Sequence, residues 1–485
     1  MRIRTYATAV TVAAAATAGL VLAPPATAAA PRPVTSDFDG DGYADLAVGV
    51  PTATVGGQPQ AGYVSVVWGG PRGLGSAGTT RVSQSGAAVP GTPEKGDHFG
   101  AAVTVADANG DGTADLLVGA PGEDVTGAGT DAGTVAVIRG TRGGLGTGTT
   151  VLNGPAARAA YGKSLAAADL TGDGTTDVAV GATDKVVLKA GGGATTTVFT
   201  GAMGGRAPVL TTGDFDGGDD GVADLAAGYW STTPFTQSHV RLWSWSPEEK
   251  SLANIWNTDN AGVSALAAGD FDGDGHDDLA LGECREIADE NIDDPCGPEE
   301  TAAGGGIHVH YGAGVPGNFG HRHQTLNQDT AGVPGVAETG DRFGASLTAA
   351  DIDGDGRDDL IAGAPGEAIG DRAKAGAATL LLGGANGLVD ASGQARSVAY
   401  QQDTPRVPGV AETGDAFGAA VATGDYDHDG APDVAVGSPG ENGGSGGVWV
   451  LPSASADGSH AFTPTGLGLP AASTPLAYGK TLSSH

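Results

Sequence analysis

The chain has 485 residues, of which 86 are glycine, and 40% of its residues are hydrophobic. This composition is too apolar for a disordered chain, and the glycines lack the three-residue period of collagen. The formal net charge of −33 disfavours nucleic acids and acidic membrane surfaces as partners, because their phosphate groups would be repelled. After the N-terminus no apolar run is long enough to cross a bilayer, so we expect no membrane insertion.

Residues 1–28 have the three-part layout of a secretory signal peptide. A short basic start is followed by an alanine-rich apolar stretch and by Ala26-Thr27-Ala28, a small-x-small cleavage signature. A membrane anchor is the less favoured alternative, because the apolar stretch is short and is interrupted by Pro24. We predict a mature chain that begins near Ala29 and is secreted, with or without retention at the cell surface.

An acidic pattern, Asp-x-Asp-Gly-Asp-Gly-x-x-Asp, recurs seven times after the signal, with some substitutions. The copies begin at Asp37, Asp107, Asp169, Asp214, Asp270, Asp351 and Asp425. The spacing of 45 to 81 residues distributes the copies along the whole mature chain. We therefore predict one repeat domain over residues 29–485, which leaves no room for a separate catalytic domain.

The pattern is typical of an all-oxygen cation site. Four carboxylates converge if the loop curls, glycine at place six permits the sharp turn, and the residue at place seven can offer its backbone carbonyl. Calcium fits best, because it accepts several carboxylates in flexible geometry, whereas magnesium requires a tighter octahedron and zinc prefers nitrogen or sulfur. The loops lack the glutamate and the flanking helices of an EF-hand. A single such loop could be a solvated hairpin, but seven in register indicate up to seven calcium sites.

The predicted ligands are the residues at places one, three, five, seven and nine of each copy. They are Asp37, Asp39, Asp41, Tyr43 and Asp45; Asp107, Asn109, Asp111, Thr113 and Asp115; Asp169, Thr171, Asp173, Thr175 and Asp177; Asp214, Asp216, Asp220, Val222 and Asp224; Asp270, Asp272, Asp274, His276 and Asp278; Asp351, Asp353, Asp355, Arg357 and Asp359; and Asp425, Asp427, Asp429, Ala431 and Asp433. The copies that begin at 37, 270 and 351 look complete. The copies at 107, 169 and 214 are expected to be the weakest, because two have lost a carboxylate and the third carries two extra residues.

The segments around each loop also repeat. An aromatic residue and a glycine stand eight residues before most loops, as in Phe99-Gly100, and a Gly-Ala-Pro-like turn follows the next apolar run, as in Gly119-Ala120-Pro121. The apolar segments are short, rich in β-branched residues and bounded by glycine or proline, which is typical of strands. Each repeat thus reads as strand, metal loop, strand, long turn, strand and a weaker fourth strand.

Tryptophans gather near the fourth copy. Four of the six in the chain lie there: Trp230, Trp243, Trp245 and Trp256. Aromatic side chains of this kind suit contacts with sugars or proteins, so they are a candidate ligand surface. Trp243 and Trp245 would share one face of a strand, and this face could equally be core between repeats.

The two cysteines, Cys284 and Cys296, flank an acidic insert. Outside the cell a pair this close in sequence is expected to form a disulfide that closes a surface loop. Two free thiols are the alternative.

The order of these motifs resembles the FG-GAP repeat. It is clearest where Phe343-Gly344 precedes the loop at Asp351 and Gly363-Ala364-Pro365 follows it. The resemblance implies an all-β, seven-bladed β-propeller of four-stranded blades, similar to that of integrin α-chains and to related repeats in secreted bacterial proteins. In that family calcium binds in a hairpin on one face, and partners usually bind on the other.

The C-terminus echoes a strand that the first repeat lacks. Tyr478-Gly479-Lys480-Thr481-Leu482 resembles Tyr161-Gly162-Lys163-Ser164-Leu165, yet no acidic loop follows it. The residues before Asp37 include two prolines and fit a central strand poorly. We predict that the C-terminal segment supplies the missing strand of the first blade and closes the ring.

These features favour a non-catalytic binding or adhesion module, monomeric, whose partner is an extracellular protein or glycan. The alternative is a calcium-dependent secreted enzyme that acts on polysaccharides. Residues 443–447 match Gly-x-Ser-x-Gly, but a glycine-rich hairpin is the more economical interpretation. The pairs His308-x-His310 and His321-x-His323 could bind a metal, although exposed histidines on strands and loops are the simpler explanation.

Overall fold

Short antiparallel strands separated by glycine-rich turns make up nearly all the regular structure in the computed structural model. The structure describes residues 36–217, 221–232, 237–259, 261–283, 304–314, 317–470 and 475–483. All of them belong to one compact unit, residues 34–485. The predicted signal peptide lies outside the described residues. In the part of the chain that is described, no helix has the length and apolar character needed to cross a membrane.

The strands form seven sheets of four, in chain order except for the last strand. The first sheet contains β28 (Thr481–Leu482), β1 (Leu46–Val50), β2 (Tyr63–Val67) and β3 (Thr79–Val82). The second contains β4 (Ala102–Ala106), β5 (Asp115–Ala120), β6 (Thr134–Thr141) and β7 (Gly144–Asn153). The third contains β8 (Ser164–Ala168), β9 (Asp177–Ala182), β10 (Lys185–Lys189) and β11 (Thr195–Thr200). The fourth contains β12 (Val209–Gly213), β13 (Asp224–Ser231), β14 (Gln237–Ser246) and β15 (Ser251–Asp259).

The remaining sheets follow the same order. The fifth contains β16 (Val263–Gly269), β17 (Asp278–Glu283), β18 (Gly306–His310) and β19 (His323–Leu326). The sixth contains β20 (Ser346–Ala350), β21 (Asp359–Ala364), β22 (Ala377–Leu381) and β23 (Ser397–Tyr400). The seventh contains β24 (Ala420–Gly424), β25 (Asp433–Ser438), β26 (Gly447–Leu451) and β27 (His460–Phe462). Two short helical turns, α1 (Glu441–Gly444) and η1 (Pro452–Ala454), flank β26.

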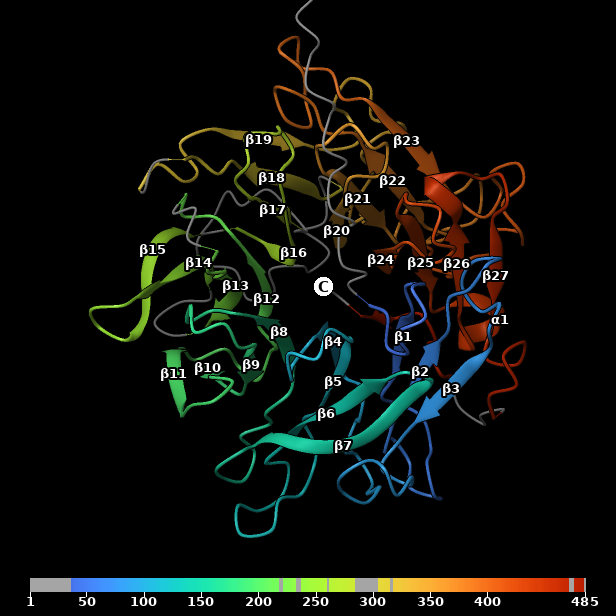
Figure 1. The fold of residues 1–485 in the computed structure, drawn as a ribbon. Helices are drawn as coiled ribbons and strands as arrows, with labels where there is room; N and C mark the ends of the chain where they lie inside the picture. Colours follow the sequence, from blue (N-terminus) through green and yellow to red (C-terminus); the bar gives the residue numbers. More distant parts are fainter. Residues whose placement is uncertain are drawn as a thin grey trace, which may run out of the picture. The chain divides into compact units, whose positions relative to one another are not determined.

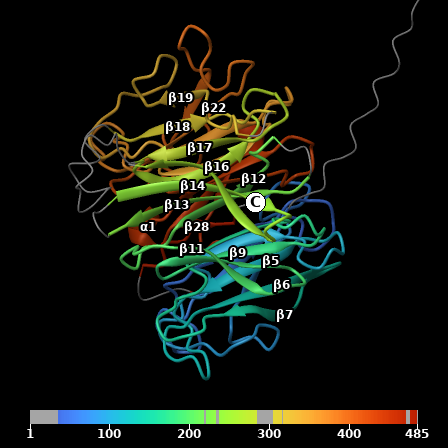
Figure 2. The ribbon, with the colours of Figure 1, turned by 90° about the vertical axis from the view of Figure 1, so that its left-hand side faces the viewer.

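The seven sheets are the blades of a β-propeller. The strands β4, β8, β12, β16, β20 and β24 lie nearest the centre in Figure 1, and the later strands of each blade lie farther out. From the side, the strands run roughly from one face of the propeller to the other (Figure 2). The predicted all-β, seven-bladed fold with four-stranded blades is therefore confirmed.

The hydrophobic core lies between the blades. Each of seven clusters of buried side chains joins residues from two neighbouring sheets, as Val48 of β1 and Val450 of β26 do in one of them. Every residue of β1, β5 and β9 is buried, because both faces of these strands are covered by adjacent blades. This explains why β1, β5 and β9 are near-continuous apolar runs, without the alternation of a half-exposed strand.

Glycines of the two flanking motifs meet across neighbouring blades. A Cβ on Gly119 would lie 2.1 Å from the carbonyl oxygen of Gly162, and a Cβ on Gly363 would lie 1.9 Å from that of Gly418. Since no side chain fits at such distances, both glycines of the repeat are required where backbone packs on backbone. The aromatic residue before the second glycine is buried beside this contact, as Phe417 is.

The C-terminal strand completes the first blade. β28 pairs with β1 in antiparallel register, with Val48 opposite Leu482 and Gly49 opposite Thr481. A Cβ on Gly437 would lie 1.8 Å from the carbonyl oxygen of Gly479, which repeats the glycine contact of the other blades. The C-terminal segment thus supplies the strand that its sequence predicts.

Candidate functional site

The seven acidic loops occupy equivalent positions in the blades. Each leads into the second strand of its blade, and place nine is the first residue of β5, β9, β13, β17, β21 and β25. In the first blade Asp45 stands directly before β1. Because backbone hydrogen bonds join loops of neighbouring blades, as described below, the loops lie at the same face of the propeller.

In the first loop the backbone turns around Asp37. Its Oδ1 accepts the N–H of Gly40 at 2.6 Å, and its Oδ2 accepts the N–H of Gly42 at 2.8 Å. The carboxylates of Asp39 and Asp41 in turn accept the N–H groups two residues further on. The N–H groups at places five and six donate to the carboxylate at place one in the first, second and third loops alike. The loop backbone therefore holds the acidic side chains close together.

Five of the loops bring three carboxylate oxygens within 4.8 Å of one another. These groups are Asp37, Asp39 and Asp41; Asp214, Asp216 and Asp224; Asp270, Asp272 and Asp278; Asp351, Asp353 and Asp355; and Asp425, Asp427 and Asp429. The loops at 107 and 169 are not among them, in line with Asn109 and Thr171 at place three. The fourth loop does form such a group, although it was expected to be weak. Its predicted ligand Asp220 lies outside the described residues.

The donor set fits a hard cation. The groups consist of oxygen donors alone, which calcium prefers. In the sixth loop Oδ1 of Asp351 is buried and accepts no hydrogen bond from the described residues. An orphaned carboxylate oxygen beside two further carboxylates is a feature that a bound cation would satisfy. The identity of the ion and the number of sites stay predictions.

The aspartate at place nine has a structural role that its spacing did not reveal. Asp45 accepts the N–H of Phe38 at 2.9 Å with one oxygen and the N–H of Gly69 at 2.9 Å with the other. Gly69 follows the third strand of the blade, so this carboxylate joins the loop to that strand. The bond to the backbone at place two recurs in all seven blades, from Phe38, Ala108, Leu170, Phe215, Phe271, Ile352 and Tyr426.

Burial disfavours the charged form of the aspartate at place nine. It raises the pKa of Asp45 to about 8 and that of Asp278 to about 8, although backbone N–H groups oppose the change. Burial also raises the pKa of Asp39 to about 6, and the negative charges of Asp41 and Asp37 add to the effect. A cation among these groups would favour their charged forms.

Neighbouring loops are linked by hydrogen bonds. The N–H at place eight donates to the carbonyl at place one of the preceding loop, for example from Ala114 to Asp37 at 3.1 Å. Ala44 donates in the same way to Asp425 at 3.0 Å, which connects the first loop to the seventh. Place eight of the seventh loop is Pro432, which has no N–H to donate. The repeated pattern does not specify the residue at place eight, so the sequence did not predict these hydrogen bonds between loops.

Arginines also contact the loops. Arg322 forms an ion pair with Asp272 of the fifth loop, and its guanidinium lies 3.6 Å from the centre of the Tyr311 ring. Arg139 pairs with Asp115 of the second loop at 2.7 Å. A cation in these loops would share the carboxylate with an arginine, so we expect weaker binding there than in the first loop.

A second set of buried acids repeats outside the loops. Asp97 accepts the N–H of Glu94 at 2.5 Å, and burial followed by the charges of Glu123 and Glu94 raises the pKa of Asp97 to about 7. Asp341 has the same place in its blade, and burial raises its pKa to about 6. These residues stabilise the turn before the aromatic-glycine motif.

The tryptophans are mostly interior. Trp230 is 8% exposed and Trp243 is 5% exposed, and Trp243 stacks on Phe199 of the neighbouring blade with ring centres 4.9 Å apart. Trp245 and Trp256 are half-buried. The burial favours core packing for the first two residues, whereas the latter two retain surface for a ligand.

The histidines do not join a candidate metal group among the described residues. His310 is half-buried, and burial together with the nearby His308 and His323 lowers its pKa to about 4. The predicted Cys284–Cys296 disulfide lies outside the described residues.

Comparison with known proteins agrees with this geometry. Six segments match the FG-GAP repeat: residues 31–67, 99–138, 161–198, 262–283, 343–381 and 417–451. The chain is an FG-GAP repeat protein. The fourth loop lies between the matched segments, as expected for the copy with inserted residues.

One curated relative is integrin alpha pat-2 of Caenorhabditis briggsae, 32% identical to this FG-GAP chain over 238 residues. The match covers 47% of the chain and 17% of that protein, so the chain spans only a small part of the relative's length. Among solved structures, a mutant of AofleA from Arthrobotrys oligospora is 11% identical, with a TM-score of 0.37 over 75% of this chain and 86% of that one.

Proposed function

We propose that the chain is a secreted, calcium-binding, integrin-like propeller that acts as a non-catalytic binding or adhesion module. Its partner would be an extracellular protein or glycan. The proposal rests on the recurrence of the acidic loops, five of which hold three carboxylate oxygens within 4.8 Å. The likeness to an integrin α-chain supports an extracellular or surface location.

Calcium would act here as a structural ion. The predicted ligands of each loop would hold the ion. The aspartate at place nine would connect the ion to the third strand, because its carboxylate accepts the backbone hydrogen bonds described above. Because neighbouring loops share hydrogen bonds, occupied loops would make one face of the propeller rigid. A rigid face favours recognition, since less conformational freedom is lost on binding.

The absence of catalysis is part of the proposal. The Gly-x-Ser-x-Gly match lies in a hairpin in which the short helix α1 precedes the strand β26, the reverse of a strand-turn-helix elbow. Asn442 and Gly443 have φ values of 53° and 68°, which interrupt α1. Ser445 therefore lacks the setting that would make it a nucleophile.

Calcium titration of the purified mature protein by calorimetry tests the ion. We expect several sites and no comparable affinity for magnesium. A glycan and protein array, probed with calcium or with a chelator, tests the binding function. Calcium-dependent capture of one ligand class is expected. Turnover of a polysaccharide that survives substitution of the calcium loops, or a chelated protein with unchanged ion content and melting point, would contradict the proposal.

A further inference from the structure

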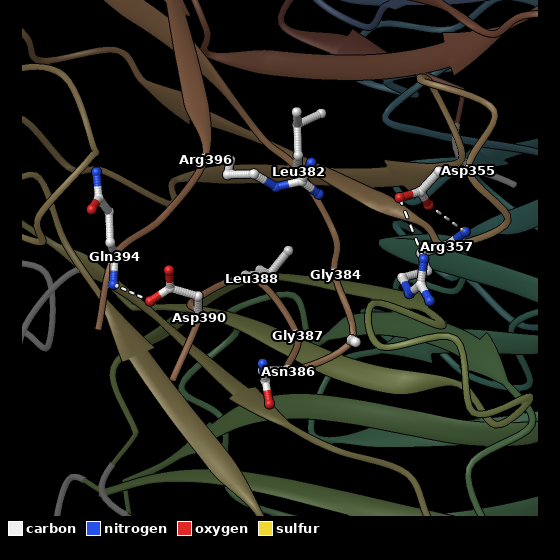
Figure 3. Close-up of a pocket in the computed structure, with 11 residues that line it drawn as sticks. Asp355, Arg357, Leu382, Gly384, Asn386, Gly387, Leu388, Asp390, Gln394 and Arg396 are labelled. Atoms are coloured by element: carbon white, nitrogen blue, oxygen red, sulfur yellow. Dashed lines mark hydrogen bonds and ion pairs between the residues drawn. The ribbon is translucent and has the colours of Figure 1, made fainter. Parts of the chain in front are cut away.

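A pocket with a cavity volume of 350 Å³ lies beside the sixth acidic loop (Figure 3). Its lining includes Arg357, Arg396, Asn386, Asp390 and Gln394. We propose that this pocket binds a carboxylate-bearing sugar, with the carboxylate held by the two arginines. This inference rests on the proposed binding function and narrows its ligand to an acidic glycan.

The wall of the pocket is held in place by the neighbouring blade. The N–H of Gly384 donates to the carbonyl of Phe271 at 3.0 Å, and the N–H of Leu388 donates to Oη of Tyr311 at 3.2 Å. The side-chain amide of Gln324 donates to two carbonyls of the same segment, at 2.6 and 2.8 Å. Because several hydrogen bonds fix this segment, it is preorganised, and a ligand would not have to order it on binding.

Gly387 marks the closest approach of this segment to the fifth blade. Its φ is +85°, and a Cβ there would lie 1.8 Å from Oη of Tyr311. The position therefore accepts only glycine, for steric and for conformational reasons. Because Tyr311 is buried, it cannot move aside, and the shape of the pocket depends on this contact.

Two guanidinium groups face the pocket from different segments, as Figure 3 shows. Nε of Arg357 donates to the carbonyl of Asp272 at 3.2 Å, and its Nη1 lies 3.4 Å from a carboxylate oxygen of Asp355. Arg396 donates through Nη2 to the carbonyl of Gly383. Each guanidinium carries five N–H groups, and these bonds to described residues use only some of them. The remaining donors can bind a carboxylate with the paired geometry that arginine favours.

The acidic groups of the pocket already have internal partners. Oδ1 of Asp390 accepts the hydroxyl of Ser392 at 2.6 Å and the N–H of Gln394 at 3.0 Å, and these bonds hold the pKa of Asp390 below its ordinary value. Asp355 belongs to the sixth loop, where it is a predicted calcium ligand. The pocket thus holds two arginines and two carboxylates, which makes it less acidic than a chain of net charge −33 as a whole.

The other lining groups suit the hydroxyl groups of a sugar. Asn386 and Gln394 each carry an amide that can donate and accept, and the second oxygen of Asp390 can accept. Both amide residues are exposed at the pocket mouth. A uronic acid combines a carboxylate with a ring of hydroxyls, which is the pattern that these groups complement, and the volume is adequate for one or two sugar rings.

The test is calorimetry in calcium with trigalacturonate and, as its neutral counterpart, the trisaccharide of galactose. We expect the intact protein to bind the acidic trisaccharide at least tenfold more tightly. Arg396→Gln is expected to lower that affinity at least tenfold. Arg406→Gln is the matched control, because it removes the same charge from an exposed ion pair with Asp457, outside the pocket, and it should change nothing.

Asn386→Ala is a second variant that leaves the arginines intact, and it should weaken both trisaccharides. Equal affinity for the two trisaccharides, or full affinity in Arg396→Gln, would overturn the inference. Binding of a glutamate-rich peptide without binding of trigalacturonate would overturn the sugar assignment. If an array identifies a ligand whose affinity Arg396→Gln leaves unchanged, the proposed binding function stands and the pocket assignment fails.

Discussion

Asp39→Asn is expected to stabilise the protein without calcium and to reduce the stabilisation that calcium confers. The oxygens of Asp37, Asp39 and Asp41 lie within 4.8 Å of one another. Two unit charges at that distance repel by ~0.9 kcal/mol in water and by ~3.5 kcal/mol at an effective dielectric of 20. Asparagine removes two of the three charge pairs and keeps the oxygen that accepts the N–H of Asp41. Without calcium, the unfolding free energy should therefore rise by about 2 kcal/mol with the repulsion calculated for water, and by more at the lower dielectric.

In calcium the same substitution has the opposite effect. A site filled at 100 times its Kd stabilises the folded state by ~2.7 kcal/mol, and at 1,000 times by ~4.1 kcal/mol. The variant should lose most of this contribution, because one ligand charge is missing. The difference between the calcium and chelator conditions should therefore shrink by roughly 3 kcal/mol.

The assay is chemical and thermal unfolding at pH 7.5, with calcium and with a chelator. At about 2 cal/mol/K per residue, ~2 kcal/mol corresponds to a midpoint shift of roughly 2 °C for a unit of this length. Asp371→Asn, an exposed carboxylate outside the loops, is the control for the change in net charge. The reasoning is refuted if Asp39→Asn destabilises the chelated protein, or if calcium stabilises the variant as much as the parent.

Three further predictions concern packing and pH. Removal of residues 476–485 deletes β28 and should lower the melting temperature by several degrees, and an unchanged value would count against its role in closing the ring. Gly437→Ala places a Cβ 1.8 Å from a carbonyl oxygen and should cost at least about 1–3 kcal/mol in unfolding free energy, whereas Gly192→Ala, in open space, should not. The raised pKa of Asp97, about 7, means that the folded state binds more protons than the unfolded state between about pH 4 and pH 7. The protonated carboxyl of Asp97 therefore stabilises the folded state at low pH, and this stabilisation is lost as the pH rises. Asp97→Asn should make the unfolding free energy, measured by denaturant titration, fall less steeply with pH. A variant whose pH dependence is the same as that of the original protein would contradict the assignment.

Most of the fold followed from local pattern. The spacing of Asp351, Asp353 and Asp355 predicted a curled acidic loop, and the structure brings their oxygens together. The Phe-Gly and Gly-Ala-Pro motifs predicted strand boundaries, and glycine contacts such as that of Gly363 with Gly418 explain why these motifs recur. Such features are readable because they repeat with every blade and depend on residues close in sequence.

Other features depend on contacts between residues that are far apart in the sequence, and local pattern did not predict them. Trp243 fits a ligand surface by composition, but its position against Phe199 places it in the interior. The role of Asp45 as a link between loop and strand needs Gly69, which lies 24 residues away. The fourth loop forms a carboxylate group despite its extra residues, because the backbone around Asp224 is fixed by its strand.

The sequence by itself determined the number of blades, the strands within each and the acidic loops, because each of these is encoded by short-range spacing that repeats seven times. Only the tertiary structure decided how loop is bonded to loop, which tryptophans are covered and how Arg357 and Arg396 come to share one pocket. The first two depend on groups from neighbouring blades, whereas the pocket depends on two segments of the sixth blade that contacts with the fifth blade hold in place. Their distances are set by packing across the whole ring, for which no local pattern carries a signal.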